Sequence, residues 1–127
     1  MAYTHEQFLR ALSVGIVFLP LINPDGVAWD QAQDACWRKN RNPASVDPAI
    51  PVSIGIDLNR NFDIYCSFTR FFVPGGGSAS DNSSSQSFHG TAAFSEPEKQ
   101  DIKWVFNTFP MQFYLDLHSP SNAVLYP

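Results

Sequence analysis

A helix signal followed at once by a strand signal limits the folds open to this sequence. Residues 95–98 have the sequence SEPE, in which Ser95 suits the N-cap and Pro97 the first turn of a helix. An apolar stripe at helical spacing follows, formed by Ile102, Val105, Phe106 and Phe109. Pro110 ends this helix, and residues 111–117 then alternate strictly between apolar and polar side chains. The pattern predicts a helix that leads into a half-buried β-strand.

The rest of the chain adds helices and strands in alternation. Thr4 and Gln7 have the spacing of a capping box, which predicts a helix over residues 5–13. Residues 15–20 form a short, continuous, β-branched run, as in a buried strand. The remaining expected segments are a turn at residues 23–26, a helix at 27–37, and loops at 43–53 and 73–87. This order of elements predicts an α/β fold in a single domain of 127 residues.

The composition is that of a globular protein and argues against some partners. Hydrophobic residues make up 44% of the chain and charged residues 16%, which is not the profile of a disordered protein. The net charge of -4 argues against nucleic acid, because phosphate binding needs a cationic surface. The longest apolar run, at residues 14–22, contains a proline and is too short to span a bilayer. The first residues do not have the pattern of a signal peptide.

Two small sets of residues leave alternatives open. Arg38, Lys39 and Arg41 form a local basic cluster, which fits either a small anionic ligand or a solvated turn. Cys36 and Cys66 can be bridged or free, because one pair defines no disulfide framework. Their spacing is not that of a cysteine-based zinc site or a redox motif.

Four segments in a fixed order carry more information together than any of them alone. They are LINPDG at 21–26, WRKNR at 37–41, GIDLNRNF at 55–62, and FHG at 88–90 with FSEPE at 94–98, LHS at 117–119 and LYP at 125–127. In order and spacing they resemble the zinc carboxypeptidase family of the carboxypeptidase A type, and the SEPE and DLHS segments look most like bacterial members. The resemblance implies that residues 1–127 are a partial catalytic domain, part of a mixed-sheet α/β (phosphorylase/hydrolase-like) fold. Members of the family hydrolyse the C-terminal peptide bond.

The resemblance assigns roles to three polar residues. Asn59 and Arg60 match the family pair that holds the terminal carboxylate of the substrate, and a guanidinium fork binds a carboxylate through two hydrogen bonds. Arg38 matches the arginine that stabilises the oxyanion of the tetrahedral intermediate. A further substrate-binding arginine corresponds here to Ala35, so that contact is expected either to be absent or to be supplied by another residue. Without the resemblance, these residues would be taken for a polar turn with a salt bridge and a surface arginine.

A histidine near the end of the chain matches the third zinc ligand of the family. This residue is His118, and a neutral imidazole suits Zn²⁺, whereas a lone histidine at a strand end is more often an ordinary buried residue. Asp116, two residues earlier, is either a hydrogen-bonding partner of the ligand or a polar residue at a strand edge. His89 matches no ligand position and is expected to be structural.

Parts of the expected catalytic site have no match in this sequence. The family takes its first two zinc ligands from a His-x-x-Glu motif before the NPDG turn, and its general base follows the HS motif. The chain is therefore expected to be an incomplete domain that is inactive alone, as a piece of a longer enzyme or a truncated product. The alternatives are a stand-alone module that binds peptide C-termini without cleaving them, and a peptidase of cell-wall peptides.

The resemblance also implies partners and a location. The expected ligands are a peptide C-terminus and zinc, and neither nucleic acid nor a membrane is expected. Exposed sheet edges would favour self-association. A secreted or periplasmic location is suggested by the family alone.

Overall fold

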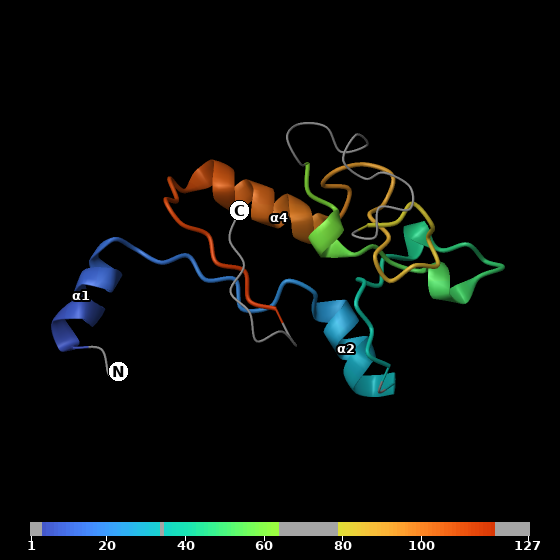
Figure 1. Cartoon of the computed structure of the whole chain (residues 1–127), viewed down its shortest axis with the longest axis horizontal. Coiled ribbons are helices and arrows are strands. Elements are labelled where there is room, and N and C mark those ends of the chain that lie inside the picture. Colours follow the sequence, from blue (N-terminus) through green and yellow to red (C-terminus); the bar gives the residue numbers. More distant parts are fainter. Residues whose placement is uncertain (1–3, 34, 64–78, 119–127) are drawn as a thin grey trace.

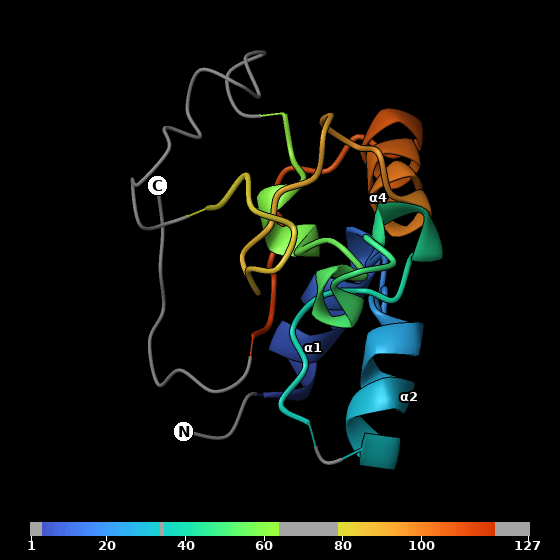
Figure 2. The same cartoon turned by 90° about the vertical axis from the view of Figure 1, so that its right-hand side faces the viewer.

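The computed structural model describes residues 4–33, 35–63 and 79–118, and their regular structure is helical. Within these residues the α-helices are α1 (His5–Ser13), α2 (Pro24–Gln33) and α4 (Pro97–Thr108). Three 3-10 helices lie in the loops between α2 and α4, namely η1 (Pro43–Ser45), η2 (Pro51–Ser53) and η3 (Leu58–Arg60). Figures 1 and 2 show α4 above α2, and Figure 1 shows α1 standing apart at one end of the molecule.

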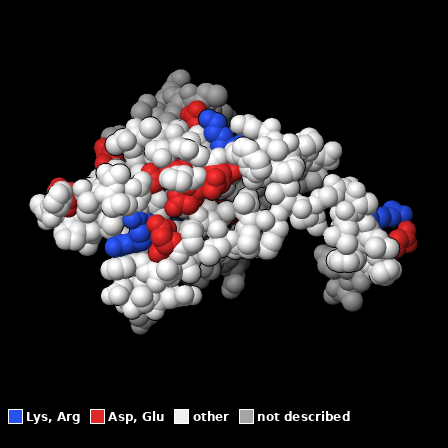
Figure 3. Space-filling model, turned by 180° about the vertical axis from the view of Figure 1, so that it is seen from behind, with Lys and Arg blue, Asp and Glu red and all other residues white. Residues whose placement is uncertain are grey.

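Helix α1 forms where the capping box predicts it. The Thr4 hydroxyl accepts the backbone N–H of Gln7, and the Gln7 side chain accepts the N–H of Thr4 at 2.9 Å. Its apolar side chains remain between 48% and 58% exposed, namely those of Phe8, Leu9 and Leu12. Figure 3 shows the helix projecting from the body of the molecule. Hydrogen bonds within the helix and its cap therefore stabilise α1, whereas most short helices depend on packing against the rest of the protein.

Helix α2 begins earlier than the sequence pattern predicts. The expected turn at 23–26 and helix at 27–37 are replaced by one helix, Pro24–Gln33. Asn23 Oδ1 accepts the N–H of Gly26 at 3.2 Å in the manner of an N-cap, and Pro24 takes the first helical position. Asparagine and proline suit the start of a helix as well as a turn, which is why the pattern was ambiguous.

Helix α4 confirms the helix predicted after the SEPE run, although Ser95 is not its N-cap. The residue before the helix is Glu96, which makes no side-chain cap. The Ser95 hydroxyl donates to Glu96 Oε1 at 2.9 Å and accepts from Asn61 Nδ2 at 3.0 Å, so it is already engaged. The predicted stripe is divided between two buried residues, Ile102 and Val105, and two exposed ones, Phe106 and Phe109.

The two strands expected at residues 15–20 and 111–117 are not formed. Strand-like pairing among the described residues is limited to two isolated bridges, Asp47 with Ile50 and Ser80 with Phe88. A strand needs a neighbouring strand for its backbone hydrogen bonds, and the described part of the chain supplies none to either segment. The mixed sheet is therefore not confirmed. The apolar stretch expected at 123–126 lies outside the described residues.

The same two segments expose large apolar side chains. Between 66% and 91% of each of these side chains is exposed: Ile16, Phe18, Phe113, Leu115 and Leu117. Such surfaces favour association, so self-association of the chain remains a prediction. None of the described helices has the length and apolar character needed to cross a bilayer.

The interior of the described structure is partly polar. Asn40, Glu96 and Asn61 are each no more than 1% exposed, and the apolar Ile56 and Ile102 are buried as well. Asn40 Nδ2 donates to Glu96 Oε2 at 2.7 Å, while its Oδ1 accepts the N–H of Ile56 at 2.8 Å. Asn61 Nδ2 donates to two backbone carbonyls, one of them that of His89, at 2.9 Å. Because buried polar groups must be paired, these amides fix the loops around them.

Candidate functional site

The 3-10 helix η3 (Leu58–Arg60) carries the two residues predicted to bind a carboxylate. Asp57 caps it, because its Oδ1 accepts the backbone N–H of Asn59 at 3.0 Å. The N–H of Arg60 donates to the Asp57 carbonyl at 2.9 Å, and Arg60 Nη1 donates to the Asn59 carbonyl at 3.0 Å. Asn59 and Arg60 are both half-buried, so η3 holds them at the boundary between interior and solvent.

Arg38 lies against the same carboxylate. Its Nε donates to Asp57 Oδ2 at 2.6 Å, and its backbone N–H donates to Gln86 Oε1 at 3.2 Å. The Arg38 side chain is 42% exposed, whereas that of Asp57 is only 3% exposed. The buried carboxylate of Asp57 therefore joins the Arg38 side chain to the backbone of Asn59 in η3, the 3-10 helix that also contains Arg60.

Asp57 is a site residue that the sequence patterns did not single out. It directly precedes the Asn-Arg-Asn run, and aspartate is a preferred N-cap, so a cap at this position was the available signal. Its second bond, to Arg38, joins residues far apart in the sequence and has no local signature.

The basic cluster does not act as one anion site. Lys39 Nζ points inward and donates to three backbone carbonyls at 2.7–3.2 Å, those of Val52, Ser53 and Ser83. The Arg41 guanidinium stacks 3.8 Å from the centre of the Trp29 ring. Arg38 is bound to Asp57, whereas Lys39 and Arg41 both also lie over the ring of Trp37, so the three side chains do not converge on one anion position. Cys36, just before this cluster in the sequence, is an exposed free cysteine, and Cys66 lies outside the described residues.

His118 belongs to a second group of side chains. Its Nε2 lies 3.2 Å from Asp116 Oδ2, with the two side chains 46% and 37% exposed. Asp116 is therefore a partner of the His118 side chain, which was one of the two alternatives for this residue. Burial raises the pKa of Tyr114, and the charge and hydrogen bond of Asp116 raise it further. His89 is buried and its main-chain carbonyl accepts a bond from Asn61, and its structural role stays a prediction.

Lys99 connects the two groups electrostatically. This lysine of α4 is 2% exposed, and its Nζ lies 3.4 Å from the centre of the Phe62 ring. Burial lowers the pKa of Lys99 from 10.5 to about 8, against the attraction of Asp116, Asp57 and Glu98. The two aspartates therefore share a buried cation.

This buried cation predicts a pH dependence of stability. Lys99 loses its proton at a lower pH in the folded chain than in the unfolded chain, so the unfolded chain binds more protons between about pH 8 and 10.5. The cost of burying the ammonium is present below pH 8 and is relieved as the pH rises through this window. Since one pH unit is worth about 1.4 kcal/mol, the whole effect is about 3 kcal/mol. We expect Lys99→Met to be more stable than the wild type near neutral pH, by a margin that shrinks towards pH 10.

Urea unfolding of both proteins at several pH values between about 7 and 9.5 measures this margin. Lys103→Met is the matched control, because Lys103 is an exposed lysine of the same helix. Its stability difference from the wild type should not depend on pH in this range. A Lys99→Met margin that stays constant with pH would contradict the prediction.

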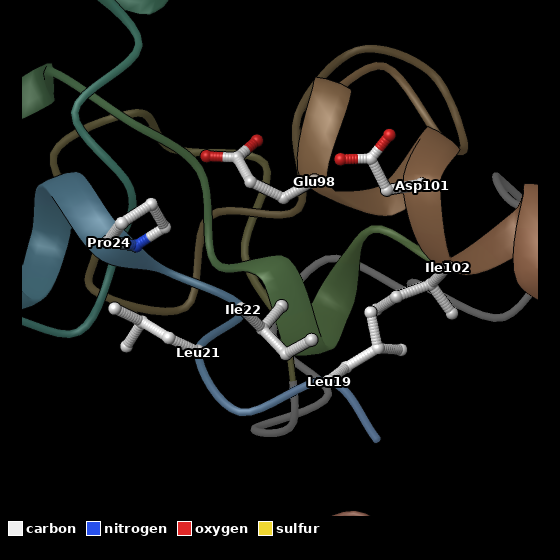
Figure 4. A pocket seen from close by; sticks show the side chains of 7 residues that line it. All are labelled: Leu19, Leu21, Ile22, Pro24, Glu98, Asp101 and Ile102. Carbon is white, nitrogen blue, oxygen red and sulfur yellow. The ribbon is translucent and has the colours of Figure 1, made fainter. Parts of the chain in front are cut away.

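A cavity is lined by residues other than Arg38, Asp57, Asn59 and Arg60. It has a volume of about 130 Å³ and is lined by Leu19, Leu21, Ile22, Pro24, Glu98, Asp101 and Ile102. Figure 4 shows the two carboxylates of α4 on one side of it and the side chains of Leu19, Leu21 and Ile22 on the other. No basic side chain lines it, so it does not suit the carboxylate of a peptide. We interpret it as a packing gap between the extended segment and α4.

Comparison with protein-family models gives the decisive observation. Residues 4–127 match the model described as "Zinc carboxypeptidase". The chain belongs to the zinc carboxypeptidase family. The family is hydrolytic, and its descriptors are carboxypeptidase, metallopeptidase and zinc.

Individual relatives agree with this assignment. The chain is 36% identical to carboxypeptidase A4 of Mus musculus, over 90% of this chain and 24% of that protein. It is 35% identical to inactive metallocarboxypeptidase ECM14 of Ajellomyces dermatitidis, over 87% of this chain and 18% of that protein. A crystal structure of carboxypeptidase A from Helicoverpa armigera matches 68% of this chain and 19% of its own, with 37% identity and a TM-score of 0.54. The chain thus spans about a quarter or less of the relatives it matches.

These comparisons settle two expectations. The similar zinc carboxypeptidases are eukaryotic, so the expected likeness to bacterial members is not supported. The structural match to a carboxypeptidase A supports the α/β class, although the described residues of this chain form no sheet.

A zinc carboxypeptidase implies a zinc ion, and the described residues do not fit a complete site for one. A catalytic zinc takes three protein ligands and leaves one position open. Among residues 4–33, 35–63 and 79–118, no three His, Cys, Asp or Glu side chains converge in a way that could hold a metal ion. The function proposed below therefore uses no step through a metal.

Proposed function

We propose that this chain is the carboxylate-binding part of a zinc metallocarboxypeptidase, an enzyme that hydrolyses the C-terminal peptide bond. The observation that carries the proposal is the bonding of Asp57, whose buried carboxylate joins the Arg38 side chain to the backbone of Asn59 in η3, the 3-10 helix that also contains Arg60. An enzyme that removes a terminal residue must recognise a free carboxylate, and a guanidinium beside an amide offers suitable donors.

Each residue of the site has a proposed role. Asn59 and Arg60 bind the terminal carboxylate, and Arg38 stabilises the oxyanion that forms at the scissile carbonyl. His118 is proposed as one zinc ligand, and its pairing with Asp116 supports this, since metal-binding histidines commonly bond a carboxylate through the other ring nitrogen.

Hydrolysis needs its own test, because some relatives are named inactive metallocarboxypeptidases. A non-catalytic module that binds peptide C-termini would share the carboxylate site and differ in zinc content. Elemental mass spectrometry of the dialysed chain separates the two. About one retained zinc per chain would favour the enzyme and justify activity assays.

The carboxylate site predicts a dependence on Arg60. We expect the chain to bind N-acetyl-Ala-Ala with its free carboxylate more tightly than the C-terminal amide of the same peptide. Arg60→Gln should weaken binding of the acid at least about tenfold, because it removes a charge-assisted hydrogen bond, and should leave the amide unaffected. Titration calorimetry or NMR titration measures both affinities.

Arg10→Gln is the matched control, since Arg10 is an exposed arginine of α1 paired only with Glu6 among the described residues. It should bind both peptides as the wild type does. Equal affinity of the wild type for the acid and the amide would contradict the proposed function.

A further inference from the structure

Asp57 holds two parts of the proposed site, one with each carboxylate oxygen. Oδ2 accepts the Nε–H of Arg38 at 2.6 Å, and Oδ1 accepts the backbone N–H of Asn59 at 3.0 Å. Asp57 is 2% exposed, so the carboxylate itself is largely removed from water. One buried carboxylate therefore sets the position of the arginine relative to the carboxylate-binding pair.

We infer that Asp57 is a positioning residue, which orients the guanidinium of Arg38 towards a substrate held by Asn59 and Arg60. The inference rests on the function proposed above. Because Asp57 binds Nε, it fixes the plane of the guanidinium and leaves the two terminal amino groups directed elsewhere. The described residues offer these amino groups no partner, so they can donate to a substrate oxygen.

Such preorientation has an energetic consequence. An arginine on a freely rotating stem loses rotamer freedom when it binds a ligand, and this loss weakens the complex. Donors fixed before the reaction also stabilise developing negative charge more than donors that must reorganise. The role of Asp57 should therefore be seen most clearly with a ligand that carries charge where the oxyanion forms.

Two probes separate this role from a structural one. The first is N-acetyl-Ala-Ala, and the second is its phosphonate analogue, in which a tetrahedral anionic group replaces the carbonyl of the last peptide bond. Both carry the terminal carboxylate, so the ratio of their affinities reports on the groups that face the tetrahedral anion, and the Arg38→Gln background isolates the share of Arg38. The ratio is measured by titration of the whole 127-residue chain and of three variants: Asp57→Asn, Arg38→Gln and the double variant.

Asp57→Asn keeps an oxygen for the N–H of Asn59 and removes the charged acceptor of Arg38. We expect it to lower the phosphonate-to-peptide ratio about tenfold in the presence of Arg38, and not to change the ratio in the Arg38→Gln background. The Nε–H resonance of Arg38 should be slow to exchange in the wild type and lose that protection in Asp57→Asn. If the Asp57 carboxylate had only a structural role, Asp57→Asn would weaken the binding of both probes equally.

The outcomes are distinguishable. An equal effect on both probes, or an effect that persists in the Arg38→Gln background, overturns the inference and leaves the proposed function intact. Failure of the wild type to bind either probe overturns the proposed function, and the inference with it. If Asp57→Asn does not fold, Arg38→Lys decides, because lysine keeps the charge but has no Nε–H. A wild-type ratio in Arg38→Lys overturns the inference, and a tenfold lower ratio supports it.

Discussion

Gly55→Ala is expected to destabilise the folded chain by on the order of 3–5 kcal/mol. Gly55 has a φ of +82°, which side-chain-bearing residues rarely adopt, and an added Cβ would overlap the backbone carbonyl of Asn40. The N–H of Asn40 bonds the Ile56 carbonyl at 3.0 Å, next to the same contact. A shift that relieves the overlap would therefore break the connection between the segments that carry Arg38 and Asp57. Urea unfolding measures the loss.

Gly15→Ala is the matched control for this change. Gly15 has the same φ of +82°, but nothing lies within 4 Å of an added Cβ. The control carries only the local strain of a left-handed residue, about 1 kcal/mol. If the two variants lose the same stability, the contact with Asn40 does not have the importance assigned to it.

Asn40→Asp is expected to cost about 3–5 kcal/mol near neutral pH, although it changes a single atom. Asn40 Nδ2 donates to Glu96 Oε2 at 2.7 Å and to Glu98 Oε1 at 3.2 Å, and Asn40 is 1% exposed. The variant places a third carboxylate against that of the buried Glu96 and that of the half-buried Glu98. These charges raise the folded pKa of the new carboxyl, so the penalty is present above that pKa and is relieved as the pH falls.

Asn82→Asp is the control for the second prediction. Asn82 is exposed, and its Oδ1 accepts the N–H of Ser84, a bond that aspartate can keep. We expect its stability to stay within about 0.5 kcal/mol of the wild type. Comparing both variants at neutral and at acid pH cancels the general effect of acid. A loss in Asn40→Asp that does not lessen in acid would show that its cause is not charge repulsion.

Local sequence signals predicted helices that the structure contains, and strands that its described residues do not form. The capping box of Thr4 and Gln7 and the stripe of α4 act within one helix, so the sequence contains the whole interaction. The alternation at 111–117 requires a neighbouring strand, and the pattern cannot state where that strand is. The sequence therefore predicted element types well only where the partners are local.

In the candidate site, too, some residues could be predicted from local sequence motifs and others could not. Arg38, Asn59 and Arg60 were predicted from their motifs, and the structure links Arg38 to the backbone of Asn59 through the carboxylate of Asp57. The roles of Asp57 and Lys99 depend on contacts between distant segments. Neither has a spacing rule in the sequence, so both required the structure.

The position of α1 has a consequence for every stability measurement on this chain. Among the described residues, the hydrogen bonds of α1 lie within the helix and its cap, so its amide protons can exchange by fraying while the loops stay closed. Helical circular dichroism would then sum two separate transitions. The indole of Trp37, which donates to the Asn40 carbonyl at 3.3 Å, lies in the loop network itself. Its fluorescence reports the unfolding of the site, and hydrogen exchange distinguishes that event from the melting of α1.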